Sequence, residues 1–181
     1  MGKIVLATII ISGSAKWLLK VGGNKEKWYG SDRIFMYVMT VFGAMTVNYS
    51  EQCTEYGWVV SNLRLLAGCL LAGGLLSAAY MDRRNCWVYN YVWWWCLPWA
   101  GILGLTAGGG FHGIVAVLVF VMLQQLLFSR MYGKADCHAF SVCALAECGN
   151  AVGMLGFLLQ MFLSVVLLTI VQLFRGNVTP R

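Results

Sequence analysis

Two aspartates, Asp82 and Asp136, are the residues of this sequence whose type and position best suit chemistry. Each lies where a long apolar stretch meets a short polar loop, in a chain with seven acidic residues among 181. Two apolar stretches separate them, so both carboxyls lie on one face of a membrane if both stretches cross it. Acidic side chains that close to a hydrocarbon core are costly and point to function. Two carboxyls that share a proton about 3 Å apart can activate water for attack on a peptide carbonyl.

The elements that must position these acids are apolar helices. The chain is 60% hydrophobic and 11% charged, and its mean hydropathy is +0.71. A soluble domain of this length could not bury so much apolar surface. Nearly continuous apolar stretches such as Ile114–Leu127 also exclude the alternation of a β-barrel. We therefore predict an all-α fold, a polytopic transmembrane helical bundle of about six to seven membrane helices, forming a single domain over residues 1–181.

Six apolar segments are expected to form these helices. They cover residues 4–21, 34–48, 58–81, 87–105 and 113–129, and the sixth region starts at Cys137 and breaks at Gly149-Asn150. The first part of the sixth region, about 13 residues, is short for a crossing at ~1.5 Å per residue, whereas residues 154–174 are long enough. The first segment also resembles a signal peptide, but apolar residues resume at Trp17-Leu18-Leu19, which favours a first span.

The charged residues alternate between successive loops. The first, third and fifth loops are basic, with Lys20, Lys25, Lys27 and Arg33, then Arg83 and Arg84, then Arg130 and Lys134. The second and fourth loops are acidic or neutral, and Glu147 lies near the same face as these. Basic loops stay in the cytoplasm, so both aspartates are expected at the cytoplasmic face. The net charge of +6 is spread over these short clusters, which argues against a nucleic-acid partner and for a lipid bilayer.

The residues after Asp82 carry the first part of a family resemblance. Asn90 follows Asp82 by eight positions, in the stretch Val88-Tyr89-Asn90. The type IV prepilin peptidases, and the related archaeal preflagellin peptidases, have Ile-Pro-Asn at the corresponding positions after an aspartate. They are membrane-embedded aspartic proteases of the GxGD kind. The spacing is kept here, and the proline is not.

The residues around Asp136 carry the second part of the resemblance. The family's second motif is Gly-x-Gly-Asp, followed by an aliphatic residue and Lys. This chain is similar, with Gly133 and Asp136 in place, Ala135 for the second glycine and His138 for the lysine. Alanine permits positive φ less readily than glycine, so a distorted loop that misplaces Asp136 is one expectation. The resemblance covers residues 58–174 as a peptidase-like core, and the chain resembles a truncated or divergent member.

The resemblance implies an integral-membrane aspartic endopeptidase of a prokaryotic cytoplasmic membrane, with Asp82 and Asp136 as its catalytic pair and its active site facing the cytoplasm. Its substrates would be prepilin-like proteins of type IV pili or secretion systems, cut between a short basic leader and an apolar helix. Gly133, Ala135, His138 and Asn90 form a second tier of site residues. No cofactor and no metal are expected. No methyltransferase activity is expected either, because nothing here resembles the family's cysteine-bearing insert. The oligomeric state is not indicated.

Other interpretations of the same residues remain open. Asp82 beside Arg83 and Arg84 also fits a solvated helix end with a surface ion pair. His138 fits either a group that tunes a carboxylate or a packed histidine, and Gly133 fits a turn. Lys134 fits a topology charge, and Asn90 fits a polar residue at the start of a helix. The rival function is a non-enzymatic polytopic protein, a small transporter or an assembly component, whose acids bind ions or serve structure.

Two further groups of residues fit packing better than chemistry. Trp93, Trp94, Trp95 and Trp99 are typical of membrane interfaces and helix contacts. The glycines of residues 72–74 and 101–104 indicate closely packed helices. The seven cysteines include no C-x-x-C pair, and those inside apolar segments behave as small hydrophobic residues.

Overall fold

The structure is a computed structural model in which six long helices follow one another along the chain. It describes residues 2–22, 30–52, 57–108, 111–126, 133–147, 156–163, 166–167 and 170. The helices are α1 (Gly2–Val21), α2 (Gly30–Gln52), α3 (Trp58–Asn85), α4 (Asn90–Thr106), α5 (Phe111–Leu126) and α6 (Lys134–Glu147). Residues 156–163 are also helical, and none of the described residues is in a strand. The predicted all-α fold is confirmed.

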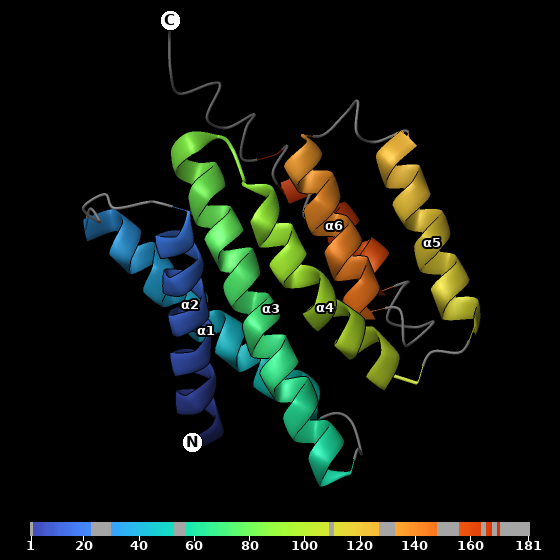
Figure 1. Ribbon diagram of the computed structural model, residues 1–181, viewed down its shortest axis with the longest axis horizontal. Coiled ribbons are helices and arrows are strands. Elements are labelled where there is room, and N and C mark those ends of the chain that lie inside the picture. Colours follow the sequence, from blue (N-terminus) through green and yellow to red (C-terminus); the bar gives the residue numbers. More distant parts are fainter. Residues whose placement is uncertain are drawn as a thin grey trace, which may run out of the picture.

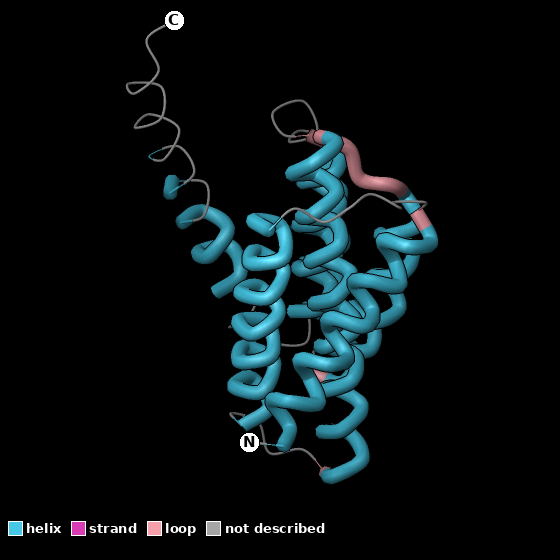
Figure 2. The backbone as a smooth tube through the Cα atoms, turned by 90° about the vertical axis from the view of Figure 1, so that its left-hand side faces the viewer, coloured by secondary structure: helices cyan, strands magenta, loops and turns pink. Residues whose placement is uncertain are grey.

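Successive helices run in opposite directions, as the colour gradient of Figure 1 shows. Helices α1, α3 and α5 therefore end at the same side of the bundle at which α2, α4 and α6 begin. We call this side, which holds the end of α3 and the start of α6, the aspartate end. The opposite side, which holds the start of α3 and the end of α6, is the arginine end. The view in Figure 2, turned by 90°, shows the described chain as helices joined by loops.

Helix α3 is the centre of the first half of the bundle and contacts α1, α2 and α4. Its glycines allow this closeness. A Cβ at Gly73 would meet the Ile11 carbonyl oxygen of α1 at 2.9 Å, and one at Gly74 would meet the Trp95 ring of α4 at 3.2 Å. The predicted close packing at these glycines is confirmed. The same prediction is wrong for Gly101, where an added Cβ would meet open space.

Three of the four tryptophans of α4 (Trp93, Trp95 and Trp99) pack, half-buried, against the core. The Trp95 ring lies 5.1 Å from that of Trp17 and 5.8 Å from that of Trp99, between ring centroids. Trp94 instead points outward, with 75% of its surface exposed. Aromatic pairs at such distances contribute about 0.5–1.5 kcal/mol each beyond the area they bury. The Trp17–Trp95 pair thus joins α1 to α4, and Trp94 lies on the outer surface.

The outer surface of the bundle is strongly apolar. Helices α1 and α3 are both long enough and apolar enough to cross a membrane, and α5 is apolar but shorter. Large apolar side chains face outward on α1, α2 and α5, among them Ile9 (61% exposed), Phe42 (63%) and Met122 (62%). A water-facing surface rarely carries so many large apolar residues side by side. The fold thus presents apolar residues both inside and outside, as expected for helices in contact with lipid.

Candidate functional site

Asp82 lies in the last turn of α3, at the aspartate end. The helix closes just beyond it, where Cys86 adopts the left-handed conformation with φ 51°. The Cys86 N–H donates to the Asp82 carbonyl oxygen at 2.9 Å. This terminal turn fixes the backbone of Asp82, while its side chain stays exposed to the outside of the bundle.

Asp136 lies in the first turn of α6, also at the aspartate end, before the apolar part of that helix. The residue that precedes α6 is Gly133, whose carbonyl oxygen accepts the first helical bond, from the Cys137 N–H, at 3.2 Å. The backbone N–H of Gly133 donates to the Asp136 carboxylate. An acidic side chain that reaches back to this position satisfies one of the unpaired N–H groups at a helix start. Asp136 therefore has a structural role as a helix cap.

The two carboxyls are close enough to influence each other. Burial raises the pKa of the Asp136 carboxyl above its ordinary value, and the negative charge of Asp82 raises this pKa further. The hydrogen bond from Gly133 lowers the pKa but does not reverse the rise. The helix start alone would favour a negative charge at Asp136, and the two raising effects outweigh it. A carboxyl of this kind retains its proton more readily when its neighbour is ionised.

The arginines that flank Asp82 in sequence are directed toward α2. Arg84 Nε lies 3.9 Å from the Oδ2 atom of Asp32, a residue that is only 7% exposed. The guanidinium of Arg83 lies over the ring of Phe35, 5.0 Å from its centroid. These contacts disagree with a surface ion pair between Asp82 and its own neighbours. They also reveal a third acid near this end, Asp32, which sequence reasoning missed although it too stands at the start of an apolar stretch.

Gly133 and Ala135 do not form a distorted loop. The φ of Gly133 lies outside the left-handed region, and a Cβ there would meet only Asp136 Oδ2, at an ordinary 3.6 Å. Gly133 therefore lacks the left-handed backbone conformation that would by itself require a glycine. Ala135 is a helical residue of α6 and packs, half-buried, against the core. Alanine is the best helix former, so Ala135 suits its place in the first turn of α6.

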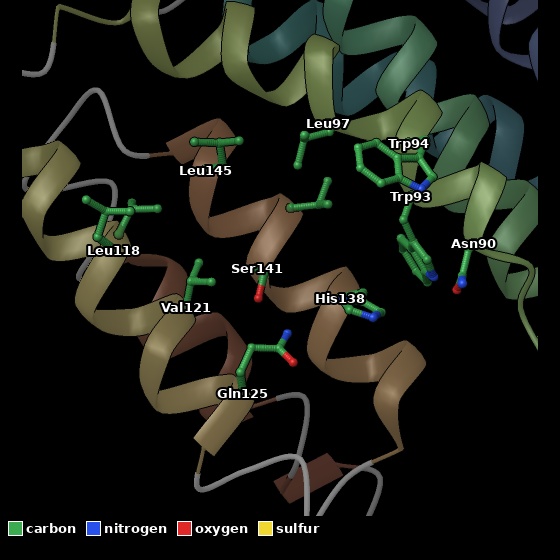
Figure 3. Close-up of a pocket in the computed structure, with 12 residues that line it drawn as sticks. Asn90, Trp93, Trp94, Leu97, Leu118, Val121, Gln125, His138, Ser141 and Leu145 are labelled. Carbon is green, nitrogen blue, oxygen red and sulfur yellow. The ribbon is translucent and has the colours of Figure 1, made fainter.

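His138 and Asn90 line a groove of about 500 Å³ between α4, α5 and α6 (Figure 3). The His138 ring packs against Trp93, with 5.9 Å between ring centroids. At about 100° per helical residue, His138 projects some 200° around α6 from Asp136. This contact favours the packed histidine over a group that tunes a carboxylate. Asn90 is the first residue of α4, which agrees with a polar residue at the start of a helix.

Glu147, the last residue of α6, lies at the arginine end. Partial burial raises the pKa of its carboxyl, and the positive charge of Arg64 opposes that rise. Arg64 precedes Asp82 by eighteen positions on α3, which corresponds to roughly 27 Å along a helix. Glu147 is therefore far from the two aspartates, as the sequence predicted.

The arrangement brings Asp82 and Asp136 together electrostatically and separates them from Glu147, while His138 points elsewhere. Coupled carboxyls at a helix end can activate water or bind a proton or cation. Within the described ranges, no group of three or more His, Cys, Asp or Glu side chains is placed to hold a metal ion. Comparison of the chain with protein-family models, curated proteins and solved structures finds no match.

Proposed function

We propose that this chain is an integral-membrane aspartic endopeptidase that removes basic leaders from prepilin-like proteins. The membrane location is supported by the two helices of sufficient length and hydropathy, α1 and α3, and by the apolar outer surface. In this proposal α2, α4, α5 and α6 also lie in the membrane, against α1 and α3. The peptidase core comprises residues 58–174, and the protein resides in a prokaryotic cytoplasmic membrane.

The orientation follows from the distribution of basic residues. Lys20, Arg33, Arg83, Arg84 and Lys134 belong to helix ends or starts at the aspartate end. Basic residues that flank membrane helices remain on the cytoplasmic side. The aspartate end is therefore cytoplasmic in this proposal, which suits a substrate whose basic leader stays inside the cell while its apolar helix stays in the membrane.

The observation that carries the catalytic assignment is that the last turn of α3 and the first turn of α6 place Asp82 and Asp136 at the same end of the bundle. The effect of the Asp82 charge on the pKa of Asp136 supports this assignment. Two acids in different environments can divide the roles of acid and base between them. Asp136, whose pKa is raised, is the partner that donates a proton. Asp82, whose side chain is exposed at the end of α3, is the partner that accepts a proton from water.

Peptide hydrolysis by this pair needs no covalent intermediate. Asp82 takes a proton from a water molecule as the water oxygen forms a bond to the scissile carbonyl carbon. Asp136 donates its proton to the carbonyl oxygen, which gives a neutral tetrahedral intermediate. The C–N bond then breaks as the leaving nitrogen takes the proton held by Asp82, and a proton returns to Asp136 from the intermediate's hydroxyl. The products are a new carboxyl group and a new amino terminus, and the pair regains its single proton.

The rival function, a non-enzymatic polytopic protein, has one observation in its favour. Asp136 accepts the Gly133 N–H and so already has a structural role at the start of α6. A helix cap of this type contributes about 1 kcal/mol to stability without any catalysis. A transporter or assembly component would need no more from this residue.

Leader cleavage in liposomes separates the two functions. Purified wild type, Asp82→Asn and Asp136→Asn are incubated with a prepilin that carries its leader, and Glu147→Gln serves as the matched control on the same helix as Asp136. Loss of a general acid or base costs about 10²–10⁴-fold in rate, so each aspartate variant should lose at least that factor while Glu147→Gln stays near wild type. Equal processing by wild type and both aspartate variants would contradict the protease assignment.

A further inference from the structure

A second cavity, of about 340 Å³, lies between α1 and α2, away from the groove of α4, α5 and α6. Its lining combines two cationic side chains with four hydroxyl groups: Lys16, Arg33, Thr8, Ser12, Tyr37 and Thr40. Nothing in the proposed peptidase mechanism uses these residues. Any function of this cavity is therefore separate from that of Asp82 and Asp136.

The polar residues form one stripe on each helix. Thr8, Ser12 and Lys16 follow one another at intervals of four on α1, and Arg33 and Tyr37 do the same on α2. Residues with this spacing lie on the same face of a helix. The two stripes face each other across the cavity because α1 and α2 are in contact and antiparallel (Figure 1).

The cations occupy the part of the cavity nearest the aspartate end. Lys16 lies five positions before the end of α1 at Val21, and Arg33 lies three positions after the start of α2 at Gly30. These positions are roughly 5–8 Å inside the helix ends. If the helices cross a membrane, both charges are at the depth of the phospholipid headgroups, and the hydroxyls of Thr8 and Thr40 are deeper.

The positive charges in this cavity are not balanced by acids in its described lining. The acid next to Arg33 in sequence, Asp32, is buried and faces Arg84 on α3 at 3.9 Å. A cation in an otherwise apolar membrane helix is costly and is normally paired. Lys16, which interrupts the apolar stretch of α1, and Arg33 therefore favour an anion from outside the chain.

The hydrogen bonds of the hydroxyl groups indicate where in the cavity an anion would bind. Thr8, Ser12 and Thr40 each donate to a carbonyl oxygen of their own helix, at 2.8, 3.1 and 2.6 Å. Their protons are thus already engaged, and the donors that remain for an anion include the charged side chains of Lys16 and Arg33. An anionic group would therefore sit at the cationic part of the cavity rather than deeper between the helices.

Apolar side chains continue the same faces below the cations. Val5 (59% exposed) and Ile9 (61%) adjoin the polar stripe of α1, and Val41 (42%) follows Tyr37 by one turn on α2. From the aspartate end inward the cations come first, and the hydroxyl and exposed apolar side chains follow together. A molecule that matches this order carries an anionic headgroup above apolar chains.

We propose that the cavity between α1 and α2 binds the phosphate group of an anionic phospholipid, through Lys16 and Arg33, with the acyl chains lying along the exposed apolar residues of both helices. Basic pockets between membrane helices on the cytoplasmic side are suited to such headgroups. Free phosphate shares the anionic chemistry but lacks chains to cover Val5, Ile9 and Val41, which favours the lipid as the source of the phosphate.

Native mass spectrometry of the full chain in neutral detergent tests this proposal. Phosphatidylglycerol or phosphatidylcholine is added to wild type, to the double variant Lys16→Gln/Arg33→Gln and to the control double variant Lys20→Gln/Lys134→Gln. The control removes the same number of charges from the same end but from outside the cavity. Each basic residue near an anionic surface contributes about fivefold in binding, so the cavity variant should lose about 20-fold in affinity for phosphatidylglycerol and the control should keep it.

Three further arms separate the lipid site from unfolding, from free phosphate binding and from a general effect of charge. The exchange Lys16→Arg/Arg33→Lys keeps both charges and should restore binding, which shows that a loss in the glutamine variant is not unfolding. Inorganic phosphate should not compete with phosphatidylglycerol, and competition at equal concentration would overturn the lipid as the source. Equal loss in the cavity and control variants, or equal binding of both lipids by wild type, would overturn the site and leave Lys16 as a side chain that extends to the membrane surface.

Discussion

Helices α3 and α6 carry charged residues at both ends of the bundle, and the two ends differ in how those charges combine. At the arginine end, Arg64 opposes the rise in the pKa of Glu147 that burial causes. At the aspartate end, Asp82 adds to the rise in the pKa of Asp136 that burial causes. The arrangement at the arginine end lowers the free-energy cost of ionising a partly buried carboxyl. The arrangement at the aspartate end raises that cost. Stability accounts for the arginine end, whereas the aspartate end is where we propose that the function lies.

The arginine end also closes a helix. The Arg64 Nη1 atom donates to the Leu103 carbonyl oxygen at 3.0 Å and to Thr106 Oγ1 at 2.9 Å, both in the last turn of α4. A cation at this position complements the partial negative charge at a helix C-terminus. Arg64 thus joins the start of α3 to the end of α4 and lies near the end of α6.

The largest effect on stability is therefore expected from Arg64→Met. Hydrogen bonds from charged donors contribute about 1.5–3 kcal/mol each, so the free energy of unfolding should fall by roughly 2–4 kcal/mol. Circular dichroism during unfolding in mixed detergent measures this change. Arg83→Met is the matched control on the same helix at the aspartate end, where a cation over the Phe35 ring contributes about 0.5–1 kcal/mol. Equal losses in the two variants would remove the difference between the ends.

A smaller effect on the free energy of unfolding is expected at Asp136, whose charged form destabilises the folded protein. Its pKa in the folded protein lies above the ordinary 3.8, so the folded state binds this proton more tightly than the unfolded state. Stability should accordingly fall as pH rises from 3.8 through the raised pKa. Asp136→Asn should lessen this fall, and unfolding midpoints measured across the acidic range compare the two proteins. A steeper fall in the variant would contradict the raised pKa.

Much of this fold follows from the order of apolar and polar residues. The predicted segment 87–105 matches helix α4 (Asn90–Thr106) within a few residues, because the glycine-rich stretch after Thr106 ends the apolar run. The location of Asp82 and Asp136 at the same end of the bundle follows as well, because two complete helices, α4 and α5, separate α3 from α6. The last predicted segment, residues 154–174, lies partly outside the described residues, and 156–163, 166–167 and 170 are helical there.

The site could be predicted less completely, because its partners come from distant helices. Spacing around Asp82 suggested Arg83 and Arg84 as partners, whereas α2 supplies Asp32 for Arg84. The sequence also does not show which neighbour His138 contacts, because that depends on which face of α6 packs against α4. The sequence carries only a general signature, an acid at the edge of an apolar stretch, and this signature applies to Asp32 as well as to Asp82 and Asp136.

Titration of the two carboxyls on α6 tests the difference between the ends most directly. Carboxyl ¹³C chemical shifts of Asp136 and Glu147 are followed against pH in wild type, Asp82→Asn and Arg64→Met. Removing the negative neighbour should lower the pKa of Asp136, and removing the positive neighbour should raise the pKa of Glu147. An Asp136 pKa that stays unchanged in Asp82→Asn would show that the aspartates do not interact, and would contradict the account of a catalytic pair.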